Sequence, residues 1–151
     1  MPFLTNRMER IFSQEEIHDI AGALVQKLLP NAKATVLALS GDLGAGKTTL
    51  VQEVGSALGI TMRMPSPTFV IMRRYPIHTL GYKNLIHIDA YRLNLSDELL
   101  KLGWNEIVNN PENIICIEWP ERVPELIPED AYTVSLEHVG ENQRKIKLHK
   151  I

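Results

Sequence analysis

A glycine-rich segment in the first third of the chain holds the residues whose spacing most clearly predicts chemistry. Residues 41–48 read Gly-Asp-Leu-Gly-Ala-Gly-Lys-Thr and match the eight-residue P-loop pattern. Glycines let the backbone curl until successive N–H groups point at phosphate oxygens, and the following helix presents its positive end to the same anion. The segment therefore predicts a binding site for the phosphates of a nucleoside triphosphate.

Two side chains of this segment have separate predicted roles. Lys47 would reach the β- and γ-phosphates, and the hydroxyl of Thr48 would ligate Mg²⁺. The alternative is a flexible turn that matches by accident, which at an average glycine usage of about 7% is expected on the order of once in a few hundred chains this short. Guanine specificity normally rests on an Asn-Lys-x-Asp tetrad, which the sequence lacks. The favoured nucleotide is therefore ATP.

Two carboxylates follow apolar runs and are candidates for the metal side of the site. Asp89 comes directly after residues 85–88, and Glu118 comes directly after residues 114–117. Ligands of open α/β sheets bind beyond the carboxyl ends of the strands, which is where both side chains are expected. We assign Asp89 to the metal's shell and Glu118 to metal contact or to orienting the attacking water. The alternative for either residue is a strand-end charge without chemistry.

The segment Pro65-Ser66-Pro67-Thr68 places two hydroxyls on a stiff backbone, because each proline fixes its own φ and restricts the residue before it. One interpretation is a switch threonine that senses the γ-phosphate through Mg²⁺. The other is a plain turn before a strand. The residues alone leave these two interpretations open.

Four further side chains lie close to the carboxylates in sequence. Arg92 and Arg122 could stabilise transition-state charge or face a partner, with an exposed, salt-bridged arginine as the alternative. Trp119 is expected to pack in the core rather than to contact a ligand. His87 is expected to be a satisfied core histidine rather than a general base.

Hydrophobic periodicity predicts the elements that would position these residues. Ser13 and Glu16 form a capping box, and apolar residues recur at helical spacing from there to Pro30. Residues 132–136 and 145–148 alternate with period two around a polar turn, which predicts an exposed antiparallel hairpin. Further strands are expected at 34–39, 69–72, 85–88 and 114–117, and helices at 48–58, 96–102 and 104–108.

The expected fold class is α/β, a three-layer sheet of the P-loop NTPase type with largely parallel central strands and an antiparallel C-terminal hairpin. The chain has 151 residues, 44% hydrophobic and 23% charged, which suits a single P-loop ATPase domain over residues 1–151. The formal net charge of −2 argues against a large nucleic-acid face, because such faces carry a basic surplus.

The remaining composition predicts a cytoplasmic protein. The single cysteine, Cys116, lies in an apolar run and is expected to be a buried small hydrophobe. The N-terminal residues lack the apolar core of a signal peptide, and no window approaches a membrane span. The five histidines are scattered, so a structural zinc site is not expected.

Four segments in register resemble the TsaE family (also called YjeE), small bacterial P-loop ATPases of tRNA threonylcarbamoyladenosine biosynthesis. The order and spacing of these segments cover roughly Phe12 to Val123. A P-loop alone would name no family, whereas four motifs in order are specific. The matching segments are residues 41–49, 66–69, 87–93 and 117–122.

The resemblance implies a function and a set of partners. A TsaE-like chain would bind and hydrolyse ATP with Mg²⁺ and would work with the TsaB and TsaD proteins. It would regulate or reset the complex that modifies the adenosine beside the anticodon, without carrying out the transfer, and would meet tRNA only through its partners. Thr68 would then sense the nucleotide.

The sequence predicts three overlapping groups of site residues. The catalytic residues are Glu118, Asp89 and Lys47, and the metal-side residues are Thr48, Asp89 and Glu118. The nucleotide-binding residues are Gly41, Asp42, Leu43, Gly44, Ala45, Gly46, Lys47, Thr48, Thr49 and Thr68.

Two departures from the family pattern and two rival functions remain. Gln52 and Glu53 stand where relatives often carry a basic residue and glycine, and the loop expected at residues 75–83 looks long. The first rival is a small-molecule P-loop kinase, which would need an acceptor pocket and an arginine-rich lid, for which Arg73-Arg74 is the available doublet. The second is a nucleotide sensor without turnover.

Overall fold

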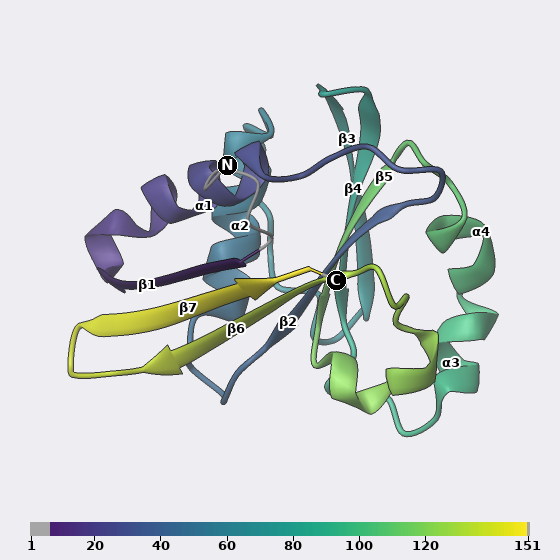
Figure 1. Cartoon of the computed structure of the whole chain (residues 1–151). Helices are drawn as coiled ribbons and strands as arrows, with labels where there is room; N and C mark the ends of the chain where they lie inside the picture. Colours follow the sequence, from purple (N-terminus) through teal and green to yellow (C-terminus); the bar gives the residue numbers. More distant parts are fainter. Residues whose placement is uncertain (1–6, 151) are drawn as a thin grey trace.

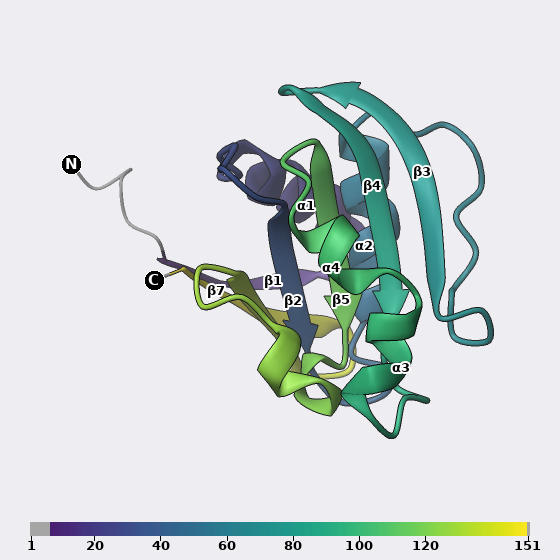
Figure 2. The same ribbon diagram turned by 90° about the vertical axis from the view of Figure 1, so that its right-hand side faces the viewer.

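The computed structural model describes residues 7–150, which form one seven-stranded sheet in the order β1-β7-β6-β2-β5-β4-β3. Helices α1 and α2 cover one face and α3 and α4 the other (Figures 1 and 2). The strands are β1 (Arg7–Ser13), β2 (Thr35–Ser40), β3 (Met72–Thr79), β4 (Tyr82–Asp89), β5 (Asn113–Glu118), β6 (Tyr132–His138) and β7 (Gln143–His149). The helices are α1 (Ile17–Gln26), α2 (Lys47–Ala57), α3 (Ser96–Lys101) and α4 (Trp104–Val108), with 3₁₀ turns η2 (Gln14–Glu16), η3 (Pro120–Arg122) and η4 (Pro124–Leu126).

The central strands are parallel and the outer strands antiparallel, which confirms the expected fold class. Strand β5 pairs in parallel with β2 and β4, and β6 pairs in parallel with β2. The outer pairs β3–β4, β6–β7 and β1–β7 are antiparallel. Strands β2 and β5, at the centre of the parallel part, are buried on both faces, as their continuous apolar sequences predict. The carboxyl ends of β2, β4 and β5 therefore lie at one edge of the sheet.

The first helix forms where its sequence signals place it. The Ser13 amide and hydroxyl donate to Oε1 of Glu16 at 2.9 and 3.0 Å, which confirms the capping box. The capped turn is 3₁₀, and α1 continues from Ile17 with Ile20, Ala21, Leu24 and Val25 buried.

Within residues 7–150, none of the helices has the length and apolar character needed to cross a membrane.

The C-terminal hairpin is antiparallel as expected, but the expected exposure holds for only one of its faces. Strand β6 pairs with β2, and β7 pairs with β1, a strand that the sequence pattern did not predict. Only Phe12 is buried in β1, so this strand has no clear alternation. The hairpin buries Val134, Leu136, Ile146 and Leu148 against the α1–α2 side of the sheet.

The expected strand at 69–72 and the expected loop at 75–83 are also wrong. Residues 68–70 form a turn in which the Ile71 amide donates to the carbonyl of Pro67 at 2.6 Å, and Ile71 has a φ of 72°. Strand β3 begins only at Met72 and forms a hairpin with β4 through residues 80–81. Pro76 is tolerated because β3 is the edge strand of the sheet.

Candidate nucleotide-binding site

The glycine-rich loop connects the end of β2 to the first turn of α2, as the P-loop pattern requires. A β-carbon on Gly41 would lie 2.5 Å from the carbonyl oxygen of Leu136, so only glycine fits beside β6. Gly46, directly before α2, has a φ of 104°, a conformation that side chains disfavour. The loop is therefore shaped by its glycines to lie against the amino end of the helix.

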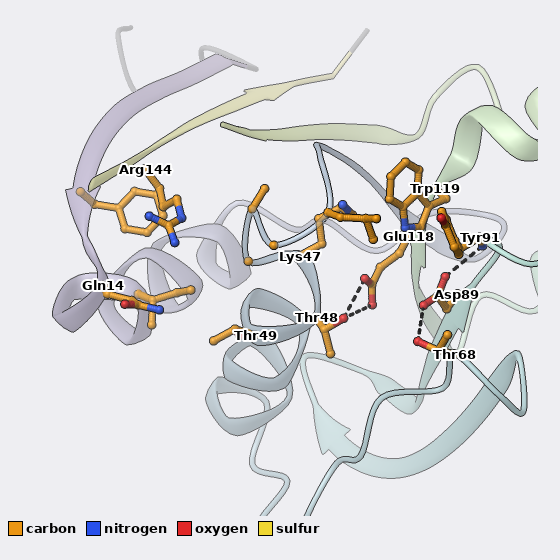
Figure 3. A pocket seen from close by; sticks show the side chains of 16 residues that line it. Gln14, Lys47, Thr48, Thr49, Thr68, Asp89, Tyr91, Glu118, Trp119 and Arg144 are labelled. Atoms are coloured by element: carbon orange, nitrogen blue, oxygen red, sulfur yellow. Dashed lines mark hydrogen bonds between the residues drawn. The ribbon is translucent and has the colours of Figure 1, made fainter. Parts of the chain in front are cut away.

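A pocket of about 350 Å³ lies over this loop. Figure 3 shows Thr68, Asp89 and Glu118 at one end of it, with Gln14 and Arg144 at the other. Lys47, Thr48 and Thr49 lie between the two ends. The lining residues are Phe12, Gln14, Ile17, Leu43, Gly44, Ala45, Gly46, Lys47, Thr48, Thr49, Thr68, Asp89, Tyr91, Glu118, Trp119 and Arg144.

Lys47 is nearly buried, at 5% exposure, and its ammonium is held by the loop. Nζ donates to the carbonyl oxygen of Gly41 and, at 3.0 Å, to that of Asp42. It also lies 4.2 Å from the centroid of the Trp119 ring. Burial lowers the pKa of Lys47, and nearby carboxylates, Glu118 first, act in the opposite direction. The ammonium of Lys47 is thus held at the loop by two backbone carbonyls, whose place as hydrogen-bond acceptors a phosphate can take.

Glu118 makes the central contact of the site. The Thr48 hydroxyl lies 2.8 and 3.0 Å from the two carboxylate oxygens and donates to them. Nε2 of His87 lies 2.6 Å from Oε2 of the same carboxylate. His87 is a core histidine, as expected, but among the described residues only its Nε2 has a polar partner, and that partner is a predicted catalytic residue. Glu118, predicted from its place after a strand, therefore contacts the P-loop helix directly.

Asp89 lies beside Glu118 at the edge of the sheet, because the parallel register of β4 and β5 pairs these two residues. Thr68 donates its hydroxyl to Oδ2 of Asp89 at 2.8 Å, and the Tyr91 amide donates to Oδ1 at 2.9 Å. The hydroxyls of Ser66 and Thr68 are 2.8 Å apart. The stiff loop therefore reaches the candidate metal side through Thr68.

The residues of this end suit Mg²⁺. That ion prefers oxygen ligands and usually takes one or two carboxylates together with substrate phosphates and waters. Thr48, Asp89 and Glu118 supply a hydroxyl and two carboxylates at one end of the pocket. In the part of the chain that the structure describes, no group of three His, Cys, Asp or Glu side chains could hold a metal ion without further ligands. A magnesium site that is completed by phosphate oxygens and waters does not need such a group.

The structure brings most of the predicted site together and separates a few residues from it. Residues 43–49, Thr68, Asp89 and Glu118 all line the one pocket. Gly41 and Asp42 do not line it and instead contribute the carbonyls that hold Lys47.

Several pocket residues were not predicted. Phe12, Gln14 and Arg144 reach the pocket because β1 pairs with β7, a long-range contact without a local signal. Trp119 packs partly against the core, as expected, and it also lines the pocket, which was not expected. Its position directly after Glu118 was an available signal.

The arginines near the carboxylates lie against aromatic rings. The guanidinium of Arg92 is 5.1 Å from the ring centroid of Phe69. The guanidinium of Arg122 is 5.3 Å from the ring centroid of Tyr91. Neither lines the pocket or forms a salt bridge with any residue from 7 to 150. Arg73-Arg74 lies in strand β3 and does not line the pocket either.

Gln52 and Glu53, which replace the usual basic residue and glycine, have partners of their own. The side-chain amide of Gln52 donates to the carbonyl of Met64 at 2.7 Å. Glu53 lies 2.8 Å from Nδ1 of His18 on α1. These residues therefore join α2 to the segment before the Ser66–Thr68 loop and to α1.

Comparison with known proteins places this geometry in a family. The profile described as threonylcarbamoyl adenosine biosynthesis protein TsaE matches residues 11–146. The chain belongs to the TsaE family. TsaE proteins are P-loop nucleotide-binding proteins of tRNA threonylcarbamoyladenosine biosynthesis, so the resemblance noted in the sequence is confirmed.

Individual TsaE relatives match over most of their length. The chain is 42% identical to the tRNA threonylcarbamoyladenosine biosynthesis protein TsaE of Synechocystis over 80% of this chain and 75% of the relative. It is 33% identical to the TsaE of Rickettsia prowazekii over 95% and 94%. A crystal structure of YdiB from Bacillus subtilis superposes with a TM-score of 0.77 and 27% identity, covering 98% of this chain and 88% of that one.

Proposed function

We propose that this chain binds ATP with Mg²⁺ in the pocket over the P-loop and hydrolyses it, serving the formation of threonylcarbamoyladenosine in tRNA. One observation supports ATP hydrolysis most directly: the buried carboxylate of Glu118 accepts a hydrogen bond from the hydroxyl of Thr48 on the P-loop helix. The relatives named for this pathway support the biological part.

The phosphate end of the pocket would be used as follows. The loop amides and Lys47 bind the β- and γ-phosphates, since charge-assisted contacts are the strong ones. Mg²⁺, when bound, neutralises charge that develops on the phosphates, and Thr48, Asp89 and Glu118 would hold it or its waters. Glu118 also orients the attacking water, while Thr68 fixes Asp89 from the neighbouring loop. The catalytic set is then Glu118, Asp89 and Lys47.

The other end of the pocket would hold the nucleoside. With the phosphates on the loop and Mg²⁺ held near the carboxylates, the base would extend toward Gln14 and Arg144 at the opposite end of the pocket. The partly exposed Ile17 offers apolar surface there, beside the buried Phe12. A glutamine amide can both donate to and accept from the edge of adenine, which fits ATP. Gln14 and Arg144 would thus contribute to nucleotide choice.

The partners would be the TsaB and TsaD proteins in the cytoplasm, with the chain as a single P-loop ATPase domain. The net charge of −2 gives this chain no basic surplus for gripping tRNA, which fits contact with tRNA only through those partners. In this role the chain regulates or resets the transferase complex between turnovers and does not carry out the transfer.

The test is ATP hydrolysis by the purified chain, alone and with TsaB and TsaD added. We expect slow turnover alone and clear stimulation by the pair. If ATP is consumed only when a small acceptor is present and that acceptor is phosphorylated, the chain is a kinase. If ATP binds without turnover even with the partners, it is a nucleotide sensor.

A further inference from the structure

His87 is a fully buried polar residue that contacts Glu118 and has no role in the function proposed above. Its imidazole is 0% exposed and lies on β4, two residues before Asp89. Nε2 is 2.6 Å from Oε2 of Glu118, and Nδ1 has no hydrogen-bond partner among the described residues. The polar contact of this ring is therefore directed entirely at Glu118.

The sheet register places this histidine behind the carboxylate. Strands β4 and β5 are parallel, with His87 opposite Cys116 and Asp89 opposite Glu118. Alternate residues of a strand share a face, so His87 and Glu118 lie on the same side of the sheet. Glu118 lines the pocket and His87 does not. The imidazole thus reaches Glu118 from the interior of the protein.

A buried carboxylate needs hydrogen-bond donors, because burial without them is costly. Thr48 is one donor to Glu118, but its hydroxyl also lines the pocket, where a metal or phosphate competes for it. Contact with His87 is shielded from any ligand. We propose that His87 is a positioning residue for ATP hydrolysis: its Nε2–H donates to Glu118 from behind and keeps the carboxylate aimed into the pocket while Thr48 serves the ligand. This inference rests on the proposed ATPase function.

Two substitutions separate positioning from simple packing. In His87→Gln the amide nitrogen can lie near the place of Nε2 and keep the donor to Glu118, whereas in His87→Asn it lies near the place of Nδ1 and the donor is lost. Loss of a residue that orients a site carboxylate typically costs about 10- to 100-fold in activity. We expect His87→Asn to lose that much in kcat with little change in nucleotide affinity, and His87→Gln to recover most of it.

The measurements are kcat for ATP, the Kd for a fluorescent ATP analogue and the melting temperature of each variant. Folded variants that hydrolyse ATP at the wild-type rate, or a Gln variant as slow as the Asn variant, would overturn the proposal. A second readout needs no activity: ¹⁵N NMR of His87 should find a proton on Nε2, and a bare Nε2 would overturn it. If the wild-type chain does not hydrolyse ATP, the proposed function fails, while the NMR result still decides the hydrogen bond.

Discussion

Thr48 and Glu118 are 70 positions apart in the chain, yet the Thr48 hydroxyl donates to both oxygens of the Glu118 carboxylate. The contact joins the first turn of α2 to the carboxyl end of β5, so the loop that would bind the phosphates and the carboxylate that would act on them form one unit. The proposed chemistry depends on this junction.

Replacing Lys47 with alanine should weaken nucleotide binding by at least about tenfold, because a hydrogen bond to a charged group contributes about 1.5–3 kcal/mol. The measurement is the Kd of a fluorescent ATP analogue. Lys33→Ala is the matched control, since Lys33 is exposed and does not line the pocket. Equal affinity of the Lys47 variant and wild type would remove Lys47 from the phosphate site.

Thr68→Val should slow hydrolysis about tenfold while nucleotide affinity stays within about twofold, because the lost hydroxyl orients Asp89 and does not itself carry the phosphates. Thr68→Ser keeps the hydroxyl and is the control. Steady-state kinetics with varied ATP separates kcat from KM. A Val variant that keeps the wild-type kcat would show that the Ser66–Thr68 loop is only a turn.

Gln14→Ala should weaken ATP binding about fivefold, equal to about 1 kcal/mol for a neutral hydrogen bond, and should reduce the preference for ATP over GTP. Competition between the two nucleotides for a fluorescent analogue measures both effects. Gln143→Ala, on the neighbouring strand and outside the pocket, is the control. Unchanged preference in the Gln14 variant would mean that the base lies elsewhere.

Cys116 should resist alkylation until the protein unfolds. The thiol is 1% exposed, and burial, followed by the nearby charge of Glu118, raises its pKa, so little thiolate exists at neutral pH. The raised pKa also affects stability. Above about pH 8.5 the thiol loses its proton in the unfolded chain but keeps it in the folded chain, so the free energy of unfolding falls as pH rises. Iodoacetamide labelling followed by mass spectrometry, with and without denaturant, checks this, and rapid labelling of the native protein would contradict it.

Site residues could be predicted from the sequence where a local pattern determines their place in the fold. Asp89 and Glu118 come at the ends of largely apolar runs and are the last residues of β4 and β5, so their place at the edge of the sheet follows from the fold class. The β3–β4 hairpin escaped prediction because Pro76 and mixed polar residues interrupt the strand pattern, which only an edge strand tolerates.

The nucleoside end of the pocket could not be predicted for a different reason. Arg144 and Gln14 are brought together by pairing of the first and last strands, between residues far apart in the chain. Nothing in the local pattern of either segment specifies that pairing. The place of Trp119 in the pocket was missed because a tryptophan beside an apolar strand usually packs in the core, whereas here its ring also faces Lys47.

The most direct test is the release of phosphate from ATP by the wild-type chain and by Glu118→Gln, alongside their affinities for the nucleotide. We predict that both bind ATP with similar Kd, that the wild type hydrolyses it, and that Glu118→Gln loses hydrolysis by about 100-fold or more, because an uncharged amide draws the proton of the attacking water far less strongly than a carboxylate does. Normal turnover by Glu118→Gln, or none by the wild type even with TsaB and TsaD present, would contradict it.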